Sequence, residues 1–239
     1  MHQHSYHSLR QARLARATKP FNARGARLVR CGDCLLAQEH CICAQAVPAG
    51  CNVDWVLLMH EDEVLKPTNT GRLLAELFPS TAVFEWARLQ PPEGLLRLLA
   101  DPDRLCLLVF PAETALAPIE AKYQAQQKSR RLTLILLDGT WKQARKMFNR
   151  TPWLAGLASI SLPLLSGHYA LRKAAHEGCL STAEAAAGLL DYLDASAALA
   201  LRTYFDQFNR AYLLSRGLRP TEDKNSQPAT SCAIGIKSQ

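Results

Sequence analysis

The sequence predicts an α/β protein, with an open, mostly parallel sheet, helices on both of its faces, and a small four-cysteine metal module at the N-terminal side. Two observations carry this prediction. Five short runs rich in Val, Ile and Leu alternate with helix-length segments from residue 53 onward, and several runs are apolar on both faces, as buried parallel strands are. Before them, four cysteines lie within thirteen residues that have little apolar pattern of their own.

The apolar runs define five expected strands, at residues 53–59, 81–86, 104–110, 131–137 and 159–164. Helix-length patterns separate or follow them, at residues 70–78, 91–100, 114–127 and 140–149. Two further helices, 182–201 and 202–216, are expected to close the chain. Ligands of such sheets bind at the carboxyl ends of the strands, so a site is expected in the segments after Met59, Phe110, Leu137 and Leu164.

These patterns divide the chain into a basic N-terminal arm (1–30), the cysteine module (31–52), an α/β domain (53–218) and a flexible polar tail (219–239). A length of 239 residues with 48% hydrophobic residues suffices for a substantial core. No apolar run approaches the length of a bilayer span, and the N-terminus has no apolar stretch typical of a secretory signal. We therefore expect a soluble, cytoplasmic protein with no membrane partner.

The net charge of +7 is concentrated in the arm. Of the 28 Lys and Arg, seven precede the first acidic residue, Asp33, and the remaining 21 equal the 21 Asp and Glu. A basic arm on a neutral body favours a polyanionic partner, nucleic acid above all, because neutralising phosphates releases condensed counterions. A solubilising tail and an Arg-rich transit peptide are the alternatives. The seven cations are Arg10, Arg13, Arg16, Lys19, Arg24, Arg27 and Arg30.

The spacing of the first four cysteines predicts a structural zinc site. Cys31 and Cys34 form a Cys-x-x-Cys knuckle, and Cys41 and Cys43 supply a second pair. His40 is an alternative ligand in place of Cys41, and an iron–sulfur cluster or a redox pair is the alternative use of the thiols. Three cysteines further along the chain are expected to be ordinary buried or loop thiols: Cys51, Cys106 and Cys179.

Polar residues follow several of the expected strands. His60 and Glu63 come after the first, and Thr68 or Asn69 suits the N-cap of the helix that follows, whose amides can hold an anion. Asp138 lies at the tip of the fourth strand, before a tight turn at Gly139. Each has a purely structural alternative. In that alternative the first segment is a solvated acidic turn followed by a simple helix cap, with His60 a satisfied polar residue at a strand end, and Asp138 or Thr140 only caps the next helix.

Two more segments add stacking and charge. Trp141 follows Asp138 and opens a helix that carries Lys142, Arg145 and Lys146. After the fifth strand, Tyr169 is followed by Arg172 and Lys173, a combination that suits a carboxylate or an RNA backbone. Ser181 and Glu184 then have the spacing of a capping box.

Taken together, these segments resemble the DTW-domain family. The signature is Leu137-Asp138-Gly139-Thr140-Trp141. Further positions agree with the family in the order that it shows, over residues 31–185: Cys31, Cys34, Cys41, Cys43, His60, Glu63, Asn69-Thr70-Gly71, Leu171-Arg172-Lys173 and Leu180-Ser181-Thr182-Ala183-Glu184-Ala185.

The resemblance implies a tRNA-uridine aminocarboxypropyltransferase with a fold similar to that of SPOUT-type methyltransferases, which carry a C-terminal knot. Such an enzyme takes S-adenosylmethionine as donor and transfers its 3-amino-3-carboxypropyl group to N3 of a tRNA uridine. The 53–218 segment would then be the S-adenosylmethionine-binding catalytic domain. The cofactor-binding residues implied are Asn69, Thr70, Gly71, Phe110, Pro111, Leu137, Leu180, Ser181 and Thr182.

The chemistry assigns roles to the remaining residues. Neutral uridine N3 carries a proton, so a base is needed, and Asp138 is the candidate. Trp141 or Tyr169 would stack on the unpaired uridine, and Arg172 or Lys173 would hold the donor's carboxylate. The arm and the cations at 142, 145 and 146 would hold tRNA phosphates. Two alternatives remain: an RNA methyltransferase using the same pocket, and a non-catalytic zinc-containing RNA-binding protein.

Overall fold

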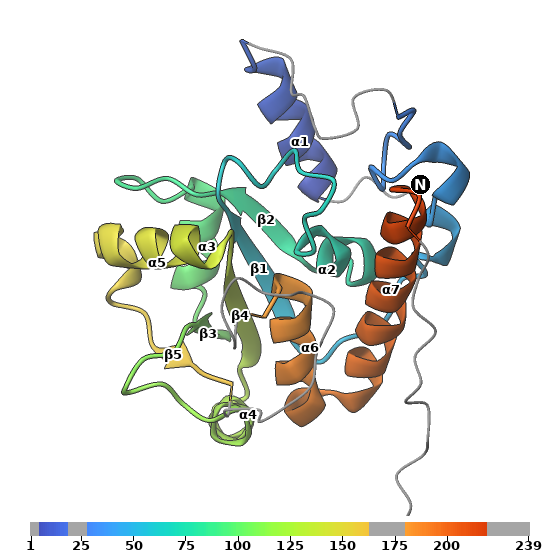
Figure 1. Cartoon of the computed structure of the whole chain (residues 1–239). Helices are drawn as coiled ribbons and strands as arrows, with labels where there is room; N and C mark the ends of the chain where they lie inside the picture. Colours follow the sequence, from blue (N-terminus) through green and yellow to red (C-terminus); the bar gives the residue numbers. More distant parts are fainter. Residues whose placement is uncertain (1–4, 19–27, 163–179, 219–239) are drawn as a thin grey trace, which may run out of the picture.

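The computed structural model describes residues 5–18, 28–162 and 180–218. They form one five-stranded sheet in the order β2-β1-β4-β3-β5, and every pairing is parallel (Figure 1). The strands are β1 (Asp54–Met59), β2 (Ala82–Glu85), β3 (Arg104–Val109), β4 (Arg131–Asp138) and β5 (Ser159–Ile160). The predicted α/β fold with a parallel sheet is confirmed. The described residues do not test the expected knot. Residues 163–179 and the expected tail, 219–239, lie outside the described part of the chain.

Seven α-helices are described, with three short 3-10 turns at Gln38–His40, Cys43–Gln45 and Pro152–Leu154. Among the described residues, no helix is both long and apolar enough to cross a lipid bilayer. The helices are α1 (Ser5–Ala15), α2 (Arg72–Leu77), α3 (Glu93–Ala100), α4 (Pro118–Gln127), α5 (Trp141–Arg150), α6 (Thr182–Leu193) and α7 (Ala195–Leu214).

The boundary between the two closing helices differs from the prediction. The break falls at Asp194, seven residues before the expected one at 201/202. Asp194 is extended (φ −159°) and its carboxylate accepts a hydrogen bond from the Ala197 N–H, so it caps α7. No glycine or proline marks this break, and Ala195 to Leu201 continue the apolar pattern. The sequence pattern therefore gives no indication of where the first helix ends.

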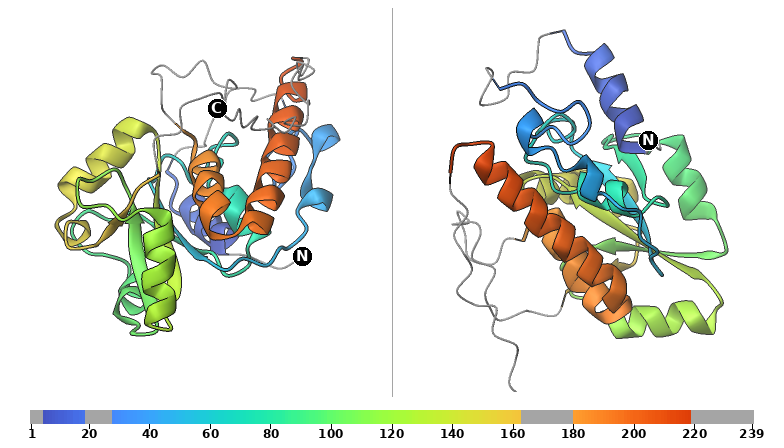
Figure 2. Two further views of the ribbon diagram at one scale, coloured as in Figure 1. Left: turned by 90° about the horizontal axis from the view of Figure 1, so that it is seen from below. Right: turned by 90° about the vertical axis from the view of Figure 1, so that its right-hand side faces the viewer.

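The crossovers determine which face each helix covers. The connections β1 to β2 and β3 to β4 run in one direction across the sheet, and β2 to β3 and β4 to β5 run in the other. Right-handed crossovers therefore place α2 and α4 on one face and α3 and α5 on the opposite face. The packing agrees, since buried residues of α2 and α4 join one apolar cluster and those of α3 and α5 join another, and Figure 2 shows the two helical layers.

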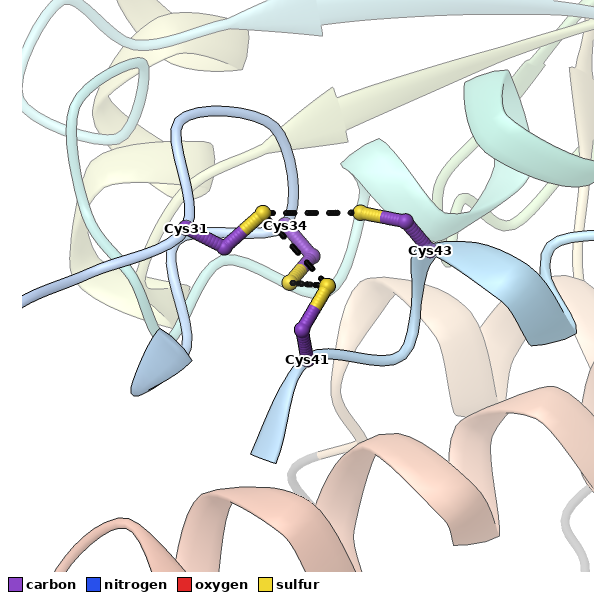
Figure 3. Close-up of side chains that lie close together, drawn as sticks. All are labelled: Cys31, Cys34, Cys41 and Cys43. Atoms are coloured by element: carbon purple, nitrogen blue, oxygen red, sulfur yellow. Dashed lines mark hydrogen bonds between the residues drawn. The ribbon is translucent and has the colours of Figure 1, made fainter. Parts of the chain in front are cut away.

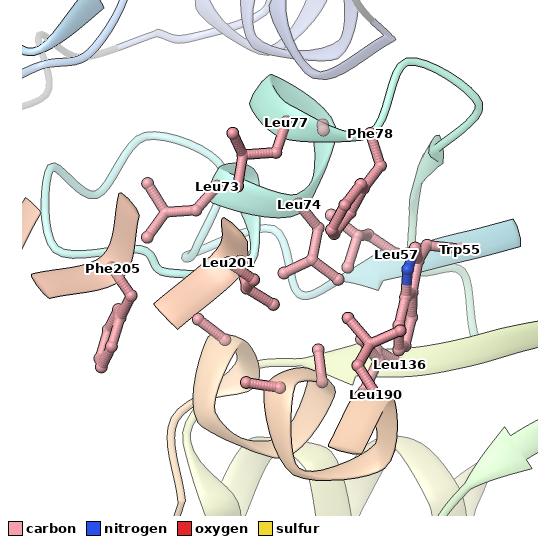
Figure 4. Close-up of a cluster of buried hydrophobic side chains, with 14 of the residues drawn as sticks. Trp55, Leu57, Leu73, Leu74, Leu77, Phe78, Leu136, Leu190, Leu201 and Phe205 are labelled. Carbon is pink, nitrogen blue, oxygen red and sulfur yellow. The ribbon is translucent and has the colours of Figure 1, made fainter. Parts of the chain in front are cut away.

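The larger cluster fills the space between the sheet and helices α2, α6 and α7 (Figure 4). Trp55, Leu57 and Leu136 extend from the strands towards Leu190 of α6 and Leu201 of α7, and all five side chains are buried. Alanines make up much of the buried face of α6, so this helix approaches β4 closely. This close approach brings the start of α6 to the tip of β4.

The N-terminal arm contains a helix that packs on the body, which the sequence did not predict. Tyr6 of α1 is fully buried, and its hydroxyl donates to the Val64 carbonyl (2.9 Å). Ser5 Oγ donates to the Thr81 carbonyl (2.8 Å), and an Arg10 guanidinium N–H donates to the Gly32 carbonyl (2.9 Å). Helix α1 thus joins β2, the cysteine module and the loop after β1.

Candidate active site and metal centre

The carboxyl ends of β1 and β4 meet at the point where the direction of the strand connections reverses. These strands are neighbours, with Met59 opposite Asp138, yet the chain leaves β1 towards β2 and leaves β4 towards β5. Diverging connections of this kind mark the usual ligand site of an open α/β sheet. The His60 N–H donates to the Asp138 carbonyl (2.9 Å), so the two departing loops begin side by side.

Asp138 is buried at this point, with 2% of its surface exposed. Its Oδ2 accepts a hydrogen bond from Asn69 Nδ2 (2.6 Å), and its Oδ1 accepts one from Thr182 Oγ1 (2.6 Å). The carboxyl group therefore joins three segments that are far apart in sequence: the end of β4, the loop before α2, and the first turn of α6.

The loop before α2 fits tightly around this carboxyl group. A Cβ atom on Gly71 would lie 2.6 Å from Asp138 Oδ1, which only glycine avoids. Asn69 Oδ1 accepts from the Arg72 N–H (2.9 Å), and Thr70 Oγ1 accepts from the Ala183 N–H (3.4 Å). The predicted residues Asn69, Thr70 and Gly71 thus adjoin Asp138, although the Arg72 amide is occupied within the loop and is not free for an anion.

The environment of Asp138 shifts its acidity. Burial raises the pKa of Asp138 to about 6, a shift opposed by the hydrogen bonds from Thr182 and Asn69. The nearby Glu63 carboxylate raises this pKa further, and the Lys66 ammonium lowers it. Glu63 and Lys66 are themselves an ion pair (2.6 Å) in the loop after β1. A carboxylate with such a pKa is ionised at neutral pH and is a stronger base than an ordinary aspartate.

A second network holds the loop after β1 against α5. Thr140 is the N-cap of α5, in a reciprocal capping box with Gln143. Gln143 Nε2 also donates to Asp62 Oδ2 (3.0 Å) and lies 3.3 Å from His60 Nδ1, while the His60 ring stacks on Trp86 (centroids 5.8 Å apart). Sequence reasoning missed Gln143 and Trp86. The spacing Thr140-x-x-Gln143 was a usable signal for the first, and no local pattern points to the second.

Trp141 lies in a separate aromatic group on the other side of the sheet tip. The residue is 48% exposed, and its ring stacks on Phe110 (centroids 6.3 Å apart, 13° between planes), which in turn stacks on Phe148 (3.9 Å, 14°). The predicted residues Phe110 and Trp141 are therefore together, but no described contact joins them to Asp138.

The remaining predicted site residues have no described side-chain contact with Asp138. Leu137 is a buried residue of β4, Ser181 caps α6 through the predicted box with Glu184, and Pro111 and Leu180 are exposed. Arg172, Lys173 and Tyr169 lie outside the described residues.

The four cysteines of the module form one cluster (Figure 3). All four sulfur atoms lie within 4.8 Å of one another, with Cys31 to Cys43 at 3.6 Å, Cys34 to Cys41 at 3.8 Å and Cys41 to Cys31 at 3.5 Å. Tetrahedral zinc with bonds of about 2.3 Å places its sulfur ligands about 3.8 Å apart, so the cluster fits zinc. His40 is not part of the group.

The surroundings of the cluster shift the thiol pKa values in both directions and tie the cluster to the body. Burial raises the pKa of Cys31, but hydrogen bonds from the Cys34 and Asp33 backbones outweigh it and lower that pKa. Burial raises the pKa of Cys34, which is 1% exposed and packs in the main apolar cluster. The Ala37 N–H donates to Ser215 Oγ (3.2 Å) just beyond α7. Four protein ligands would leave no open position, which is typical of structural zinc.

Two comparisons relate the chain to known proteins. The chain is 31% identical over 145 residues to tRNA-uridine aminocarboxypropyltransferase 2 of Drosophila melanogaster, an alignment that covers 58% of this chain and 55% of that protein. The chain thus spans about half the length of that relative. No solved structure matches the chain significantly. The family model of the DTW domain matches residues 28–213, from just before the cysteine cluster almost to the end of α7, and the chain therefore belongs to the DTW domain family.

Proposed function

We propose that this chain is a tRNA-uridine aminocarboxypropyltransferase that uses S-adenosylmethionine. The observation that carries the proposal is the convergence of three separate segments, those of Asn69, Asp138 and Thr182, on one buried carboxyl group at the divergence of β1 and β4. Family membership and the activity in the relative's name support it.

The proposed reaction is a substitution at carbon. S-adenosylmethionine supplies a 3-amino-3-carboxypropyl group whose terminal carbon is bonded to a sulfonium. A bond forms from uridine N3 to this carbon, the carbon–sulfur bond breaks, and its electron pair leaves with neutral methylthioadenosine. The N3 proton goes to a base. Since the sulfonium is a good leaving group, positioning and proton removal are the tasks left to the protein.

We assign the proton to Asp138. Its raised pKa supports this role, because a carboxylate with a pKa of about 6 is ionised at neutral pH and accepts a proton more readily than an ordinary aspartate. Each oxygen keeps one lone pair beyond its bond to Asn69 or Thr182. Because Asp138 is only 2% exposed, this role requires that substrate binding open access to it, whereas a purely positioning role does not.

Other residues would bind the two substrates. The adenosine would lie against the segments of Phe110 and Pro111, of Leu137, and of residues 180–182. Arg172 or Lys173 would hold the carboxylate of the transferred group by charge-assisted hydrogen bonds. An unpaired uridine would stack on Trp141, whose exposed ring supports this assignment.

The test is a single reaction. Purified protein is incubated with unmodified tRNA and S-adenosylmethionine, and the nucleosides of the digested RNA are weighed. A uridine heavier by the aminocarboxypropyl group, with methylthioadenosine released, is the expected result. A methylated nucleoside would overturn the chemistry but keep the pocket. No modification of any of several tRNAs would favour a zinc-containing RNA-binding protein.

Asp138→Ala then separates the two roles of the carboxylate. If Asp138 is the base, the variant loses transfer but binds S-adenosylmethionine with nearly the affinity of the wild-type protein. Calorimetry measures this affinity. Equal loss of transfer and binding would assign Asp138 to the organisation of the cofactor site instead.

A further inference from the structure

Four cations on helix α5 have no acidic partner among the described residues. Lys142, Arg145, Lys146 and Arg150 are all exposed, and none takes part in an ion pair within the described part of the chain. The helix itself contains no Asp or Glu. Their spacing of three, four and eight residues from Lys142 places them along one outward face, about 12 Å long at 1.5 Å per residue.

The three arginines in α1 and directly after it already have partners within the protein. Arg13 pairs with Glu61 (3.5 Å) and Arg16 pairs with Glu85 (2.6 Å), on the loop after β1 and on β2. Arg10 donates to the Gly32 carbonyl. These side chains are engaged in attaching α1 to the body, so their charge is partly compensated within the molecule.

The position of α5 connects its charge to the site. The helix begins three residues after Asp138, and its first residue is the half-exposed Trp141. Gln143, between the first two cations, contacts Asp62 and lies beside His60 at the end of β1. A polyanion lying on the cations of α5 would therefore run past an exposed aromatic ring towards the divergence of β1 and β4. An aromatic ring beside unpaired cations suits nucleic acid better than an acidic peptide.

We infer that the outward face of α5, formed by Lys142, Arg145, Lys146 and Arg150, is the docking surface for the phosphate backbone of the RNA substrate. The inference rests on the proposed function for the identity of that RNA as tRNA. The docking surface inferred here differs from the one expected from the sequence in two ways. Arg13 and Arg16 of the arm are not part of it, and Arg150 is.

The experiment measures the salt dependence of tRNA binding to the full-length chain. Each lost phosphate contact lowers the slope of log Kd against log salt by roughly one, so Lys142→Ala with Lys146→Ala is expected to weaken binding at low salt and to lower the slope by about two. Arg145→Ala with Arg150→Ala is a second pair on the same face, for use if the first pair shifts the melting temperature.

Two control pairs carry the same loss of charge. Lys128→Ala with Arg130→Ala alters residues just before β4, at the opposite end of that strand from α5, and is expected to leave the slope unchanged. Arg13→Ala with Arg16→Ala is expected to lower the melting temperature while leaving the slope unchanged. An unchanged slope in both α5 pairs, or an equal change in the Lys128 and Arg130 pair, would overturn the inference.

The outcome is separable from that of the proposed function. If tRNA binds through α5 but no nucleoside is modified, the docking surface stands and the transferase proposal fails. If the α5 variants bind and modify tRNA as well as the wild-type protein does, the transferase proposal stands and the docking surface fails. Binding of S-adenosylmethionine, measured on the same preparations, is expected to stay unchanged in the α5 pairs.

Discussion

Gly71 is the residue whose replacement tests the geometry of the site most directly. In Gly71→Ala the added carbon meets the Asp138 carboxyl group at 2.6 Å, and that group is held by two hydrogen bonds and cannot move aside freely. We expect a loss of about 1–3 kcal/mol in the free energy of unfolding, as for an overpacked core, with a loss of transfer. Denaturant unfolding measures the first. Gly156→Ala is the matched control, because nothing lies within 4 Å of its new carbon, and equal stability of the two variants would contradict the prediction.

In the proposed reaction, the hydroxyl of Thr182 should set the pH at which transfer begins. Its hydrogen bond to Asp138 favours the ionised carboxylate and lowers a pKa that burial raises to about 6. In Thr182→Val the donor is lost, so the pKa of Asp138 rises and the acidic limb of the pH–rate profile moves to higher pH. Thr182→Ser keeps the hydroxyl and should keep the limb in place. A limb that stays fixed in the valine variant would show that Asp138 is not the titrating base.

At this scale the sequence predicted residue identities better than contacts. Asn69, Gly71, Asp138 and Thr182 were all expected at the site, and the structure brings them together. That Gly71 faces the Asp138 carboxyl group could not be read from a sequence, because the two are 67 residues apart and meet only through sheet register.

Elements with a strong local pattern were predicted, and those defined by long-range contacts were not. All five strands fall within or close to the apolar runs, since a buried parallel strand needs apolar residues on both faces. Helix α1 is mostly polar and was expected only as a basic arm. Its position depends on Tyr6, which becomes buried against a loop 58 residues further along the chain.

Strands β1, β3 and β4 are joined at their other end by an ion network that predicts a pH dependence of stability. Asp54 accepts hydrogen bonds from Arg131 (2.8 Å) and Arg104 (2.6 Å). Burial raises the pKa of Asp54, but these two hydrogen bonds outweigh it and lower that pKa. The stabilisation is therefore complete above the ordinary aspartate range and is lost as pH falls through the lowered value.

Asp54→Asn removes the charge and keeps the shape. We expect a loss of about 1–2 kcal/mol in the free energy of unfolding near neutral pH. Most of this loss should come from the weakened interaction with Arg104, because the side chain of Arg131 is 42% exposed and its ion pair is screened by water. The difference in the free energy of unfolding between the variant and the wild-type protein should shrink below about pH 4. Urea unfolding across this range measures it, and a difference that stays constant with pH would exclude an ionic origin.

At the scale of the whole molecule, the cysteine cluster and the α/β body should melt as one unit. Cys34 packs in the same apolar cluster as Trp55 of β1 and Phe208 of α7, and Arg10 of α1 bonds to Gly32 between the first two ligands. Metal bound to the folded state alone stabilises whatever folds with it. The predicted boundary at residue 52 therefore separates sequence patterns more clearly than it separates the packing of the core.

Cys34→Ser tests this coupling. The variant should lose zinc, measured by elemental analysis, and should lower the melting temperature of the sheet and helices followed by circular dichroism in a single transition. Cys106→Ser is the matched control, because Cys106 is a free thiol of β3 outside the cluster, and it should retain one zinc per chain. Two separate transitions in Cys34→Ser, with the later one unshifted, would mean that the cysteine module is an independent unit and that its burial against α7 adds no stability to the α/β body.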